Sequence, residues 1–322
     1  MTHPILQVLD TSYGDITVEL EAAKAHGVDV VDRDDTSVQA DGVLVQYAQI
    51  TGETLDAHPT WAVVGRYGVG YDTIDVAAAT ERGVAVVNVP DYCEEEVATH
   101  AAALVLASVR RIREADTLTR AGGWPNWHDL LPVPALSEAT LSLIGVGRIG
   151  RKTINLLRAF FGRVVAYDPY AQPIDGVEMV DLDTAVKVGD VISLHCPLTP
   201  DTHHIINADR LAMMKPHAHL VNVSRGGLVD SVALAAALRA NALGGAAVDV
   251  LECEPPSPDD PLLSAPRLTV TNHLAWYSAR SEPRLRSLLA SRCAGMLVGV
   301  DAPSVVNRAG LAARLTTAEK AR

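Results

Sequence analysis

Short apolar runs alternate with Ala- and Glu-rich stretches of helical spacing along most of this chain. This pattern is typical of parallel β-sheets whose strands are connected by helices. The runs of a first series are residues 5–9, 28–31, 43–47, 62–65 and 84–89. The runs of a second series are residues 141–146, 164–168, 191–195, 220–224, 246–251 and 268–271. The sequence therefore predicts an α/β fold with two doubly wound parallel-sheet domains.

The length of 322 residues also favours two domains, because a single core rarely grows so large. A long helix is predicted over residues 93–113, with glutamates at its start and arginines at its end, as the helix dipole favours. A last helix is predicted over residues 284–298 and would return to the first domain. We expect one domain to comprise residues 1–95 and 276–322, and the other residues 96–275.

Composition narrows the class of ligand. The net charge of -12 disfavours nucleic acids and anionic membranes as partners. The four cysteines, residues 93, 196, 253 and 293, are far apart and predict neither a disulfide framework nor a metal site. Residues 1–10 show no basic region followed by an apolar one, and no apolar run in the sequence approaches about 20 residues. We therefore expect a cytoplasmic protein without a metal.

A glycine-rich loop follows the predicted strand 141–146 and precedes a helical stretch. The loop reads Gly145, Val146, Gly147, Arg148, Ile149, Gly150. In this context, glycines permit a tight turn, close approach of the backbone to a pyrophosphate and packing of helix on strand. The helix N-terminus adds the positive end of its dipole. The sequence predicts a Rossmann domain that binds a dinucleotide, with a simple glycine-rich turn as the alternative.

Asp168 ends the next predicted strand, 18 residues after Gly150. An acid at this place accepts hydrogen bonds from an adenosine ribose. Pro169 and Tyr170 follow it, so no cation is available there for a 2′-phosphate. The expected cofactor is therefore NAD rather than NADP, although Asp168 could also cap a turn.

Three polar segments follow strands of the second series, at residues 222–227, 249–255 and 271–273. They contain Arg225, Glu254 and His273, and ligands of such sheets bind beyond the carboxyl ends of the strands. Hydride transfer to C2 of a 2-oxo acid needs a cation for the carboxylate and carbonyl, and a proton donor for the oxygen. Arg225 suits the first role and His273 the second, with Glu254 favouring the charged imidazolium. Taken alone, an arginine or a histidine at such a place more often has a structural role, and the catalytic interpretation depends on the three residues together, downstream of the glycine-rich loop.

The sequence resembles the D-isomer-specific 2-hydroxyacid dehydrogenase family along nearly its whole length. The matching stretches are residues 65–75, 88–93, the glycine-rich loop, residues 195–199 and the three polar segments. Residues 167–170 and 276–278 are similar to the branch that contains the C-terminal binding proteins, which we group here with the phosphoglycerate-dehydrogenase-like branch. Asn272 departs from the family, since many members have Pro before the catalytic His, and His100 and Leu274 are further variations.

The resemblance implies a Rossmann coenzyme domain inserted in a flavodoxin-like substrate domain, D-stereospecific chemistry and a homodimer built through the coenzyme domains. It implies that Arg225, Glu254 and His273 form the active site. The substrate carboxylate would be bound by the backbone amides of Gly68, Val69 and Gly70, for which a plain turn is the alternative. Further cofactor contacts are implied at Cys196, Thr202, Val223 and Asp249, the last binding the carboxamide unless it is a solvated acid.

Substrate specificity is expected to come from Tyr47 in the first domain and from Trp276, although either ring could serve packing alone. Residues 45–50 contain no Lys or Arg, which disfavours a phosphate-bearing acid, and Arg66 is the nearby cation that could reverse this. The sequence does not identify the acid. Two other functions remain open: an NAD(H)-sensing corepressor-like protein with little turnover, and a dehydrogenase of formate or phosphite.

Overall fold

The computed structural model describes residues 3–33, 38–124, 126–130 and 133–312. The chain divides into two compact units, which we call unit 1 (Met1–Cys93 and Tyr277–Arg322) and unit 2 (Glu94–Trp276). Within the described ranges, no helix is both long and apolar enough to span a bilayer.

Unit 1 is built on a five-stranded sheet with the strand order β2-β1-β3-β4-β5, and every strand pair in it is parallel. Its strands are β1 (Ile5–Val8), β2 (Asp29–Asp32), β3 (Gly42–Val45), β4 (Val63–Arg66) and β5 (Ala85–Val87). Its helices are α1 (Thr17–Lys24), α2 (Gly52–Ala57), α3 (Val76–Arg82) and α10 (Ser281–Leu297). This strand order is that of flavodoxin-like folds.

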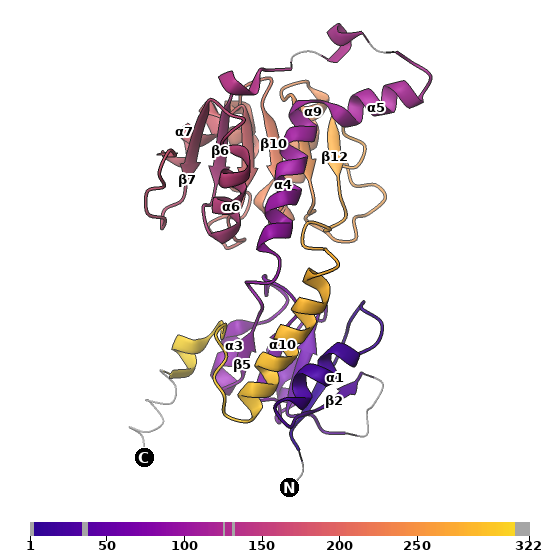
Figure 1. Cartoon of the computed structure of the whole chain (residues 1–322), viewed down its shortest axis with the longest axis vertical. Coiled ribbons are helices and arrows are strands. Elements are labelled where there is room, and N and C mark those ends of the chain that lie inside the picture. Colours follow the sequence, from indigo (N-terminus) through magenta and orange to yellow (C-terminus); the bar gives the residue numbers. More distant parts are fainter. Residues whose placement is uncertain (1–2, 34–37, 125, 131–132, 313–322) are drawn as a thin grey trace. The chain divides into compact units, whose positions relative to one another are not determined.

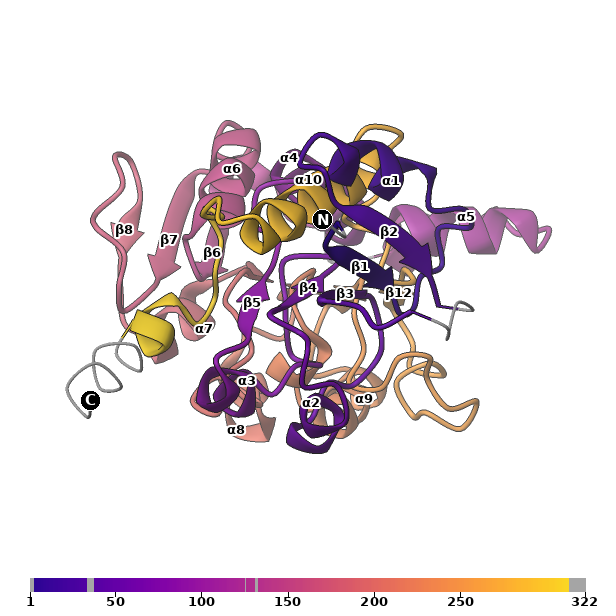
Figure 2. The same ribbon diagram turned by 90° about the horizontal axis from the view of Figure 1, so that it is seen from below.

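Helices cover both faces of the unit 1 sheet. Figure 2 shows α1 and α10 on one face and α2 and α3 on the other. Strands β3 and β5 are buried along their whole length, as expected for a parallel sheet between two helical layers. The carboxyl ends of β3 and β4, which are neighbours in the sheet, lead into the loops that contain the predicted substrate residues of unit 1.

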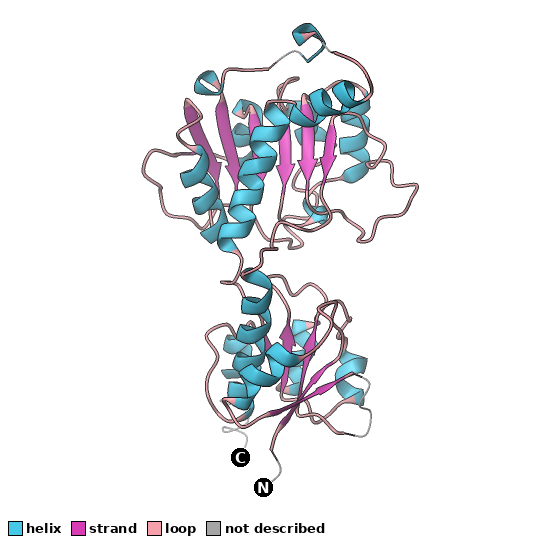
Figure 3. Cartoon of the chain, turned by 45° about the vertical axis from the view of Figure 1, so that its right-hand side comes forward, coloured by secondary structure: helices cyan, strands magenta, loops and turns pink. Residues whose placement is uncertain are grey.

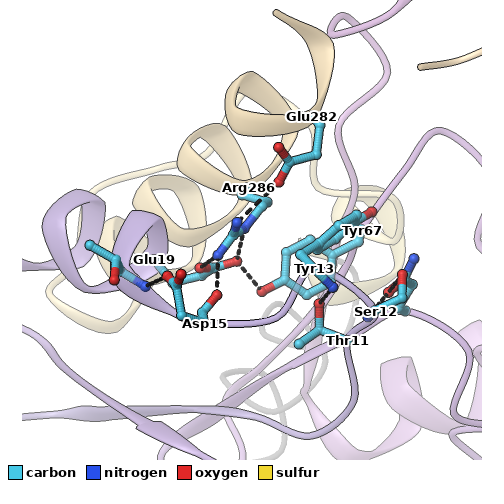
Figure 4. Close-up of polar contacts among 10 residues, drawn as sticks. Thr11, Ser12, Tyr13, Asp15, Glu19, Tyr67, Glu282 and Arg286 are labelled. Atoms are coloured by element: carbon cyan, nitrogen blue, oxygen red, sulfur yellow. Dashed lines mark hydrogen bonds and ion pairs between the residues drawn. The ribbon is translucent and has the colours of Figure 1, made fainter. Parts of the chain in front are cut away.

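A buried ion pair joins α1 to α10 (Figure 4). The guanidinium of Arg286 donates to both carboxylate oxygens of Glu19 at 2.9 and 2.7 Å, and to Glu282 at 3.0 Å. The Tyr67 hydroxyl also donates to Glu19, at 2.8 Å, and Arg286 lies 5.4 Å from the ring centre of Tyr13. Because Glu19 is only 1% exposed and Arg286 5%, this pair fixes the late helix α10 against the first helix of the chain.

Unit 2 contains a seven-stranded sheet with the order β12-β11-β10-β9-β6-β7-β8, again with parallel pairs throughout (Figure 3). Its strands are β6 (Thr140–Ile144), β7 (Arg163–Tyr167), β8 (Glu178–Met179), β9 (Val191–Leu194), β10 (His219–Asn222), β11 (Gly245–Val248) and β12 (Leu268–Val270). Its helices are α4 (Glu94–Val109), α5 (Ile112–Arg120), α6 (Arg148–Leu157), α7 (Leu182–Val188), α8 (Ala208–Met213) and α9 (Ser231–Arg239). Short 3-10 turns occur at Trp127–Leu130, Leu136–Glu138 and Gly226–Leu228.

The order of strands in unit 2 reverses between β6 and β9, which is the switch point of a Rossmann fold. Ligands of such sheets bind beyond the carboxyl ends of the strands at this point. The predicted α/β class with two doubly wound parallel sheets, one Rossmann and one flavodoxin-like, is confirmed. The two-residue strand β8 was not predicted, because it is too short to produce a recognisable apolar run.

The predicted helix 93–113 is wrong in its extent. Helix α4 ends at Val109, and a separate helix α5 begins at Ile112. The break is at Arg111, whose φ of 52° lies in the left-handed region and cannot continue an α-helix. Helix α5 has no buried residue and extends away from the sheet of unit 2 (Figure 1).

Candidate active site

The glycine-rich loop lies between β6 and α6, and each glycine meets a different constraint. Gly145 has a φ of 93°, and a Cβ there would lie 2.6 Å from the backbone nitrogen of Cys196. A Cβ at Gly150 would collide with the carbonyl oxygen of Gly145, so a glycine is needed for α6 to pack on the loop. A Cβ at Gly147 would meet nothing within 4 Å, which leaves open space beside the N-terminus of α6. This combination fits a dinucleotide pyrophosphate.

Asp168 follows β7 and is tied to the same loop. Its carboxylate accepts the backbone N–H of Val146 at 2.9 Å and that of Tyr170 at 2.9 Å. The first contact places an acid next to the glycine-rich turn, where the ribose of a bound dinucleotide would lie. Arg148 and Ile149 form the first turn of α6, and the Arg148 side chain is 60% exposed and lies 3.5 Å from Glu94.

His273 and Glu254 are paired directly. Nδ1 of His273 lies 2.6 Å from Oε2 of Glu254, and the other oxygen of Glu254 accepts the Leu251 N–H at 2.8 Å. Burial alone would raise the pKa of Glu254, but the hydrogen bond and charge of His273, the Leu251 amide and the charge of Arg225 together lower it. Glu254 is therefore a carboxylate at neutral pH, and Nε2 is the ring nitrogen of His273 that does not face it.

Arg225 follows β10 and precedes the turn Gly226–Leu228. Its side chain is half-buried, and one guanidinium nitrogen donates to the carbonyl oxygen of Ser224 at 2.8 Å. Its charge acts on the carboxylate of Glu254, so the structure brings all three predicted catalytic residues to one edge of the unit 2 sheet. The close approach of Gly226 to the backbone of Leu251 holds the two segments together, since a Cβ at Gly226 would overlap that backbone.

Asp249 orients the loop that carries His273. It is 1% exposed, and its carboxylate accepts the N–H groups of Leu274 and Ala275, each at 2.9 Å, and the hydroxyl of Thr271 at 2.5 Å. Its backbone oxygen accepts the N–H of His273 at 2.7 Å. These contacts hold His273 at a φ of 56°, a conformation that costs energy for a residue other than glycine.

Thr271 and His100 complete this network, and the sequence analysis assigned neither of them a role in the site. Nε2 of His100, on α4, lies 3.1 Å from the Thr271 hydroxyl and 3.5 Å from the Asp249 carboxylate. Thr271 directly follows β12, so its hydroxyl could have been noticed in the sequence. The contact from His100 on α4 could not have been noticed, because His100 is 171 residues from Thr271.

The other predicted cofactor residues lie in unit 2 after strands β9 and β10. Cys196 follows β9, and burial raises the pKa of its thiol to about 11, so it is an apolar lining residue rather than a nucleophile. The Thr202 hydroxyl donates to the carbonyl oxygen of Pro197 at 2.7 Å, and Val223 is buried. All three lie at the carboxyl edge of the sheet that also bears the glycine-rich loop.

The predicted carboxylate loop lies in unit 1, directly after β4. Gly68 has a φ of 139°, its carbonyl oxygen accepts the Val89 N–H at 2.9 Å, and that of Val69 accepts Asn88 at 2.7 Å. The backbone N–H groups of Gly68, Val69 and Gly70 have no acceptor within the described part of the chain. Unpartnered consecutive amides of this kind suit an anion.

The two predicted specificity residues belong to different units. Tyr47, in unit 1, is 65% exposed, and its hydroxyl accepts Nε2 of Gln46 at 3.0 Å. Asp10 holds this loop by accepting the N–H groups of Gln46, Tyr47 and Ala48. Trp276 is the last residue of unit 2 and is half-buried.

The sequence analysis predicted no metal site. Among the described residues, however, three side chains that could bind a metal ion lie close together. The ligand atoms of His203, His204 and Glu252 lie within 4.8 Å of one another. Nε2 of His204 is 2.5 Å from Oε1 of Glu252, so the two side chains form a direct hydrogen bond. This cluster could not be predicted from sequence, because Glu252 is 48 residues from His204.

The family model for the D-isomer specific 2-hydroxyacid dehydrogenase NAD binding domain matches residues 102–275. The chain belongs to this family. It is 37% identical over 273 residues to a glyoxylate reductase of Thermofilum pendens, covering 83% of this chain and 80% of the relative. It is 36% identical over 319 residues to a D-3-phosphoglycerate dehydrogenase of Mycobacterium tuberculosis, covering 96% of this chain and 60% of that longer relative.

A solved structure of D-lactate dehydrogenase from Aquifex aeolicus, complexed with NAD and lactic acid, is similar with a TM-score of 0.81 and 28% identity, covering 92% of this chain and 96% of that one. These findings confirm the predicted family, its phosphoglycerate-dehydrogenase-like branch and the nicotinamide cofactor. The protein is an NAD-dependent D-2-hydroxyacid dehydrogenase, and the corepressor-like alternative is not favoured.

Proposed function

We propose that the protein transfers a hydride between NAD(H) and C2 of a small 2-oxo or 2-hydroxy acid, with Arg225, Glu254 and His273 as its catalytic residues. The observation that carries the proposal is the 2.6 Å contact between Nδ1 of His273 and the carboxylate of Glu254. The positive charge of Arg225 helps to lower the pKa of the same carboxylate. A guanidinium and a carboxylate-supported imidazole are the two groups that reduction of a 2-oxo acid requires.

In the direction of reduction, Arg225 binds the substrate carboxylate and polarises the C2 carbonyl through its planar fork. The nicotinamide, when bound, supplies the hydride to C2. The carbonyl oxygen then takes a proton from Nε2 of His273, because Nδ1 is engaged by Glu254. The hydride and this proton together convert the 2-oxo acid to the 2-hydroxy acid. Oxidation follows the same steps in reverse, with neutral His273 accepting the hydroxyl proton.

The cofactor is proposed to lie along the carboxyl edge of the unit 2 sheet. Its pyrophosphate would meet the loop Gly145, Gly147, Arg148, Ile149, Gly150, supported by the open space at Gly147. Asp168 would accept the adenosine ribose hydroxyls and disfavour a 2′-phosphate, which agrees with NAD as the cofactor. Further contacts are proposed from Cys196, Thr202 and Val223. We keep Asp249 as the carboxamide partner, a role that it would combine with orienting the His273 loop.

Unit 1 is proposed to bind the substrate. The amides of Gly68, Val69 and Gly70 would bind its carboxylate, supported by their lack of other acceptors among the described residues. Tyr47 and Trp276 would contact the group attached to C2 of the substrate. Two relatives point to small acids: one is a glyoxylate reductase, and the other was solved with lactic acid. We therefore propose a short, unphosphorylated 2-oxo acid as substrate.

A homodimer built through the coenzyme domains is also proposed. Helix α5 has no buried residue, yet it exposes 56% of Ile112 and 43% of Leu118, and the nearby Trp124 is 91% exposed. Apolar exposure of this kind is typical of an association surface. A cytoplasmic location is proposed as well, because all four cysteines are free thiols.

The proposed function is tested by the steady-state oxidation of NADH with glyoxylate, pyruvate, hydroxypyruvate, phenylpyruvate and 3-phosphohydroxypyruvate. We expect saturable turnover of at least one unphosphorylated acid, and a fall in kcat/KM of about a thousandfold in Arg225→Ala with NADH affinity retained. Binding of NADH without turnover of any acid would instead support the nucleotide-sensing alternative. Turnover that survives Arg225→Ala would remove the role assigned to that residue.

A further inference from the structure

Two consecutive histidines and a glutamate of unit 2 place three metal-binding atoms close together. His203 and His204 lie in the loop after β9, and Glu252 lies in the segment after β11. Their ligand atoms are all within 4.8 Å of one another. Nitrogen and oxygen ligands about 2.1 Å from one zinc ion are at most about 4.2 Å apart. Small rotations of these side chains would therefore bring all three onto a single ion.

The two histidines lie on the same side of their loop. Consecutive side chains of an extended strand point in opposite directions, but the rings of His203 and His204 are stacked, with centroids 4.0 Å apart and planes at 23°. His204 has a φ of 49°, in the left-handed region, and its N–H donates to the carbonyl oxygen of Gly227 at 2.8 Å. This backbone conformation is costly for a residue other than glycine and is found more often at functional sites.

The carboxylate of Glu252 is ionised and oriented. Burial alone would raise its pKa, but hydrogen bonds from Ser231 and His204 together lower it. One carboxylate oxygen lies 2.5 Å from Nε2 of His204, and the other accepts the hydroxyl and the N–H of Ser231, the first residue of α9. An outer hydrogen bond of this kind fixes the direction of a metal-binding carboxylate.

A second histidine–carboxylate pair in unit 2 shows what distinguishes this cluster. Nε2 of His217 lies 2.8 Å from an oxygen of Asp190, and the ammonium of Lys215 lies 2.8 Å from the same oxygen. The lysine supplies a positive charge to that carboxylate, and the pair is not part of any three-ligand group among the described residues. At Glu252, by contrast, a second imidazole takes the place of the ammonium.

The ligand set indicates the class of metal. Two imidazole nitrogens and one carboxylate oxygen suit zinc and similar divalent transition metals, whereas calcium and magnesium prefer oxygen ligands alone. The side chains of His204 and Glu252 are each 32% exposed, and His203 is exposed, so an ion can enter from solvent. Three protein ligands leave at least one coordination position for water.

We propose that His203, His204 and Glu252 bind one divalent transition-metal ion, of which zinc is the type. The ion replaces the hydrogen bond between His204 and Glu252 and links the loop after β9 to the segment after β11. Because Glu252 is 48 residues from His204, the unfolded chain does not hold the ligands together, and binding stabilises the folded state. No step of the proposed hydride transfer uses this ion.

The test is isothermal titration of the intact, chelator-treated protein with zinc chloride. We expect saturable binding of one ion per chain and a higher Tm with zinc. His203→Gln and Glu252→Gln should each weaken zinc at least tenfold, because each removes one ligand. His204→Asn should do the same, since asparagine tolerates the left-handed backbone. If His204→Asn does not fold, the exposed positions 203 and 252 still provide the test.

His217→Gln is the matched control, because it removes a histidine of the other histidine–carboxylate pair. It should bind zinc like the wild type. Cobalt should give visible bands without a thiolate charge-transfer band, since Cys253 beside Glu252 is not a proposed ligand. Chelator treatment should leave kcat unchanged.

Four results would overturn the proposal. They are the lack of saturable binding at one ion per chain, zinc affinity in His203→Gln and Glu252→Gln equal to that of His217→Gln, a thiolate band with cobalt, and a fall in kcat on chelation. The third would place the ion on Cys253, and the fourth would place it in the catalytic site.

Discussion

Glu254 illustrates how a single charge sets up the site. Its carboxylate accepts hydrogen bonds from the Leu251 N–H and from Nδ1 of His273. These contacts outweigh the burial that would otherwise raise the pKa of Glu254. It therefore remains a carboxylate from neutral pH down to below the usual range of a glutamate. As a carboxylate it accepts a hydrogen bond from Nδ1 of His273, which leaves Nε2 as the ring nitrogen proposed to donate a proton during reduction.

Glu254→Gln tests this charge, because glutamine preserves the size and an acceptor for Nδ1 but not the negative charge. We expect kcat for reduction at pH 7 to fall by about ten- to a hundredfold. Glu252→Gln is the control, since its carboxylate faces His204 and Ser231 instead. An unchanged kcat for reduction in Glu254→Gln would contradict the role of this carboxylate.

The three proposed catalytic residues could be singled out from sequence, because Arg225, Glu254 and His273 belong to polar segments that follow apolar strands. Their support could not be predicted. Asp249 looks like a cofactor residue in the sequence, and only the structure places both of its oxygens on the loop after β12. His100, on α4, contacts the Thr271 hydroxyl although the two residues are 171 positions apart in the sequence. No local sequence pattern indicates such a contact.

At the level of elements, the apolar runs predicted the longer strands well, because strands buried on both faces produce continuous apolar sequences. The helix boundaries were less predictable. Residues 93–113 have a helical composition throughout, and the break at Arg111 depends on one left-handed backbone conformation that composition does not reveal. The contact of α10 with α1 is equally hidden, since Glu19 and Arg286 are 267 residues apart.

The pair between α1 and α10 should be important for the stability of unit 1. Arg286→Met leaves the buried carboxylate of Glu19 without its counter-ion, and we expect a loss of about 3–5 kcal/mol in the free energy of unfolding. The double variant Glu19→Leu/Arg286→Met removes both charges and should recover at least half of that loss. Urea unfolding of Arg286→Met, Glu19→Leu and the double variant measures these free energies of unfolding. If the losses of the two single variants simply add in the double variant, the two side chains do not stabilise each other.

At the level of the whole molecule, the two units divide the expected tasks. Unit 2 carries the glycine-rich loop and the three proposed catalytic residues, and unit 1 carries the loop of Gly68, Val69 and Gly70, whose amides have no acceptor among the described residues. The division into two α/β units follows from two series of apolar runs in the sequence. The small cavity of unit 2 that is lined by Arg111, His219 and Arg267 could not be foreseen, because these residues come together only when α5 and the amino ends of the strands are in place.

The stability of the whole protein should depend on pH through buried histidine. Below about pH 6.5 the unfolded chain takes up a proton at residue 219, whereas the folded chain does not until about pH 4. The free energy of unfolding should therefore fall as the pH drops through this window, by up to about 3 kcal/mol from this residue. His219→Asn should flatten the dependence, and the exposed His58→Gln should not. Equal slopes in wild type and His219→Asn, measured by urea unfolding at several pH values, would contradict this assignment.

Single-turnover oxidation of bound NADH, followed by its absorbance after rapid mixing with excess 2-oxo acid, isolates the chemical step from substrate binding and product release. The acid is the one turned over in steady state, and wild type is compared with His273→Ala. We predict that His273→Ala binds NADH with wild-type affinity but transfers the hydride at least a hundredfold more slowly, because the developing alkoxide lacks its proton donor. Hydride transfer at the wild-type rate in His273→Ala would contradict the proposed chemistry.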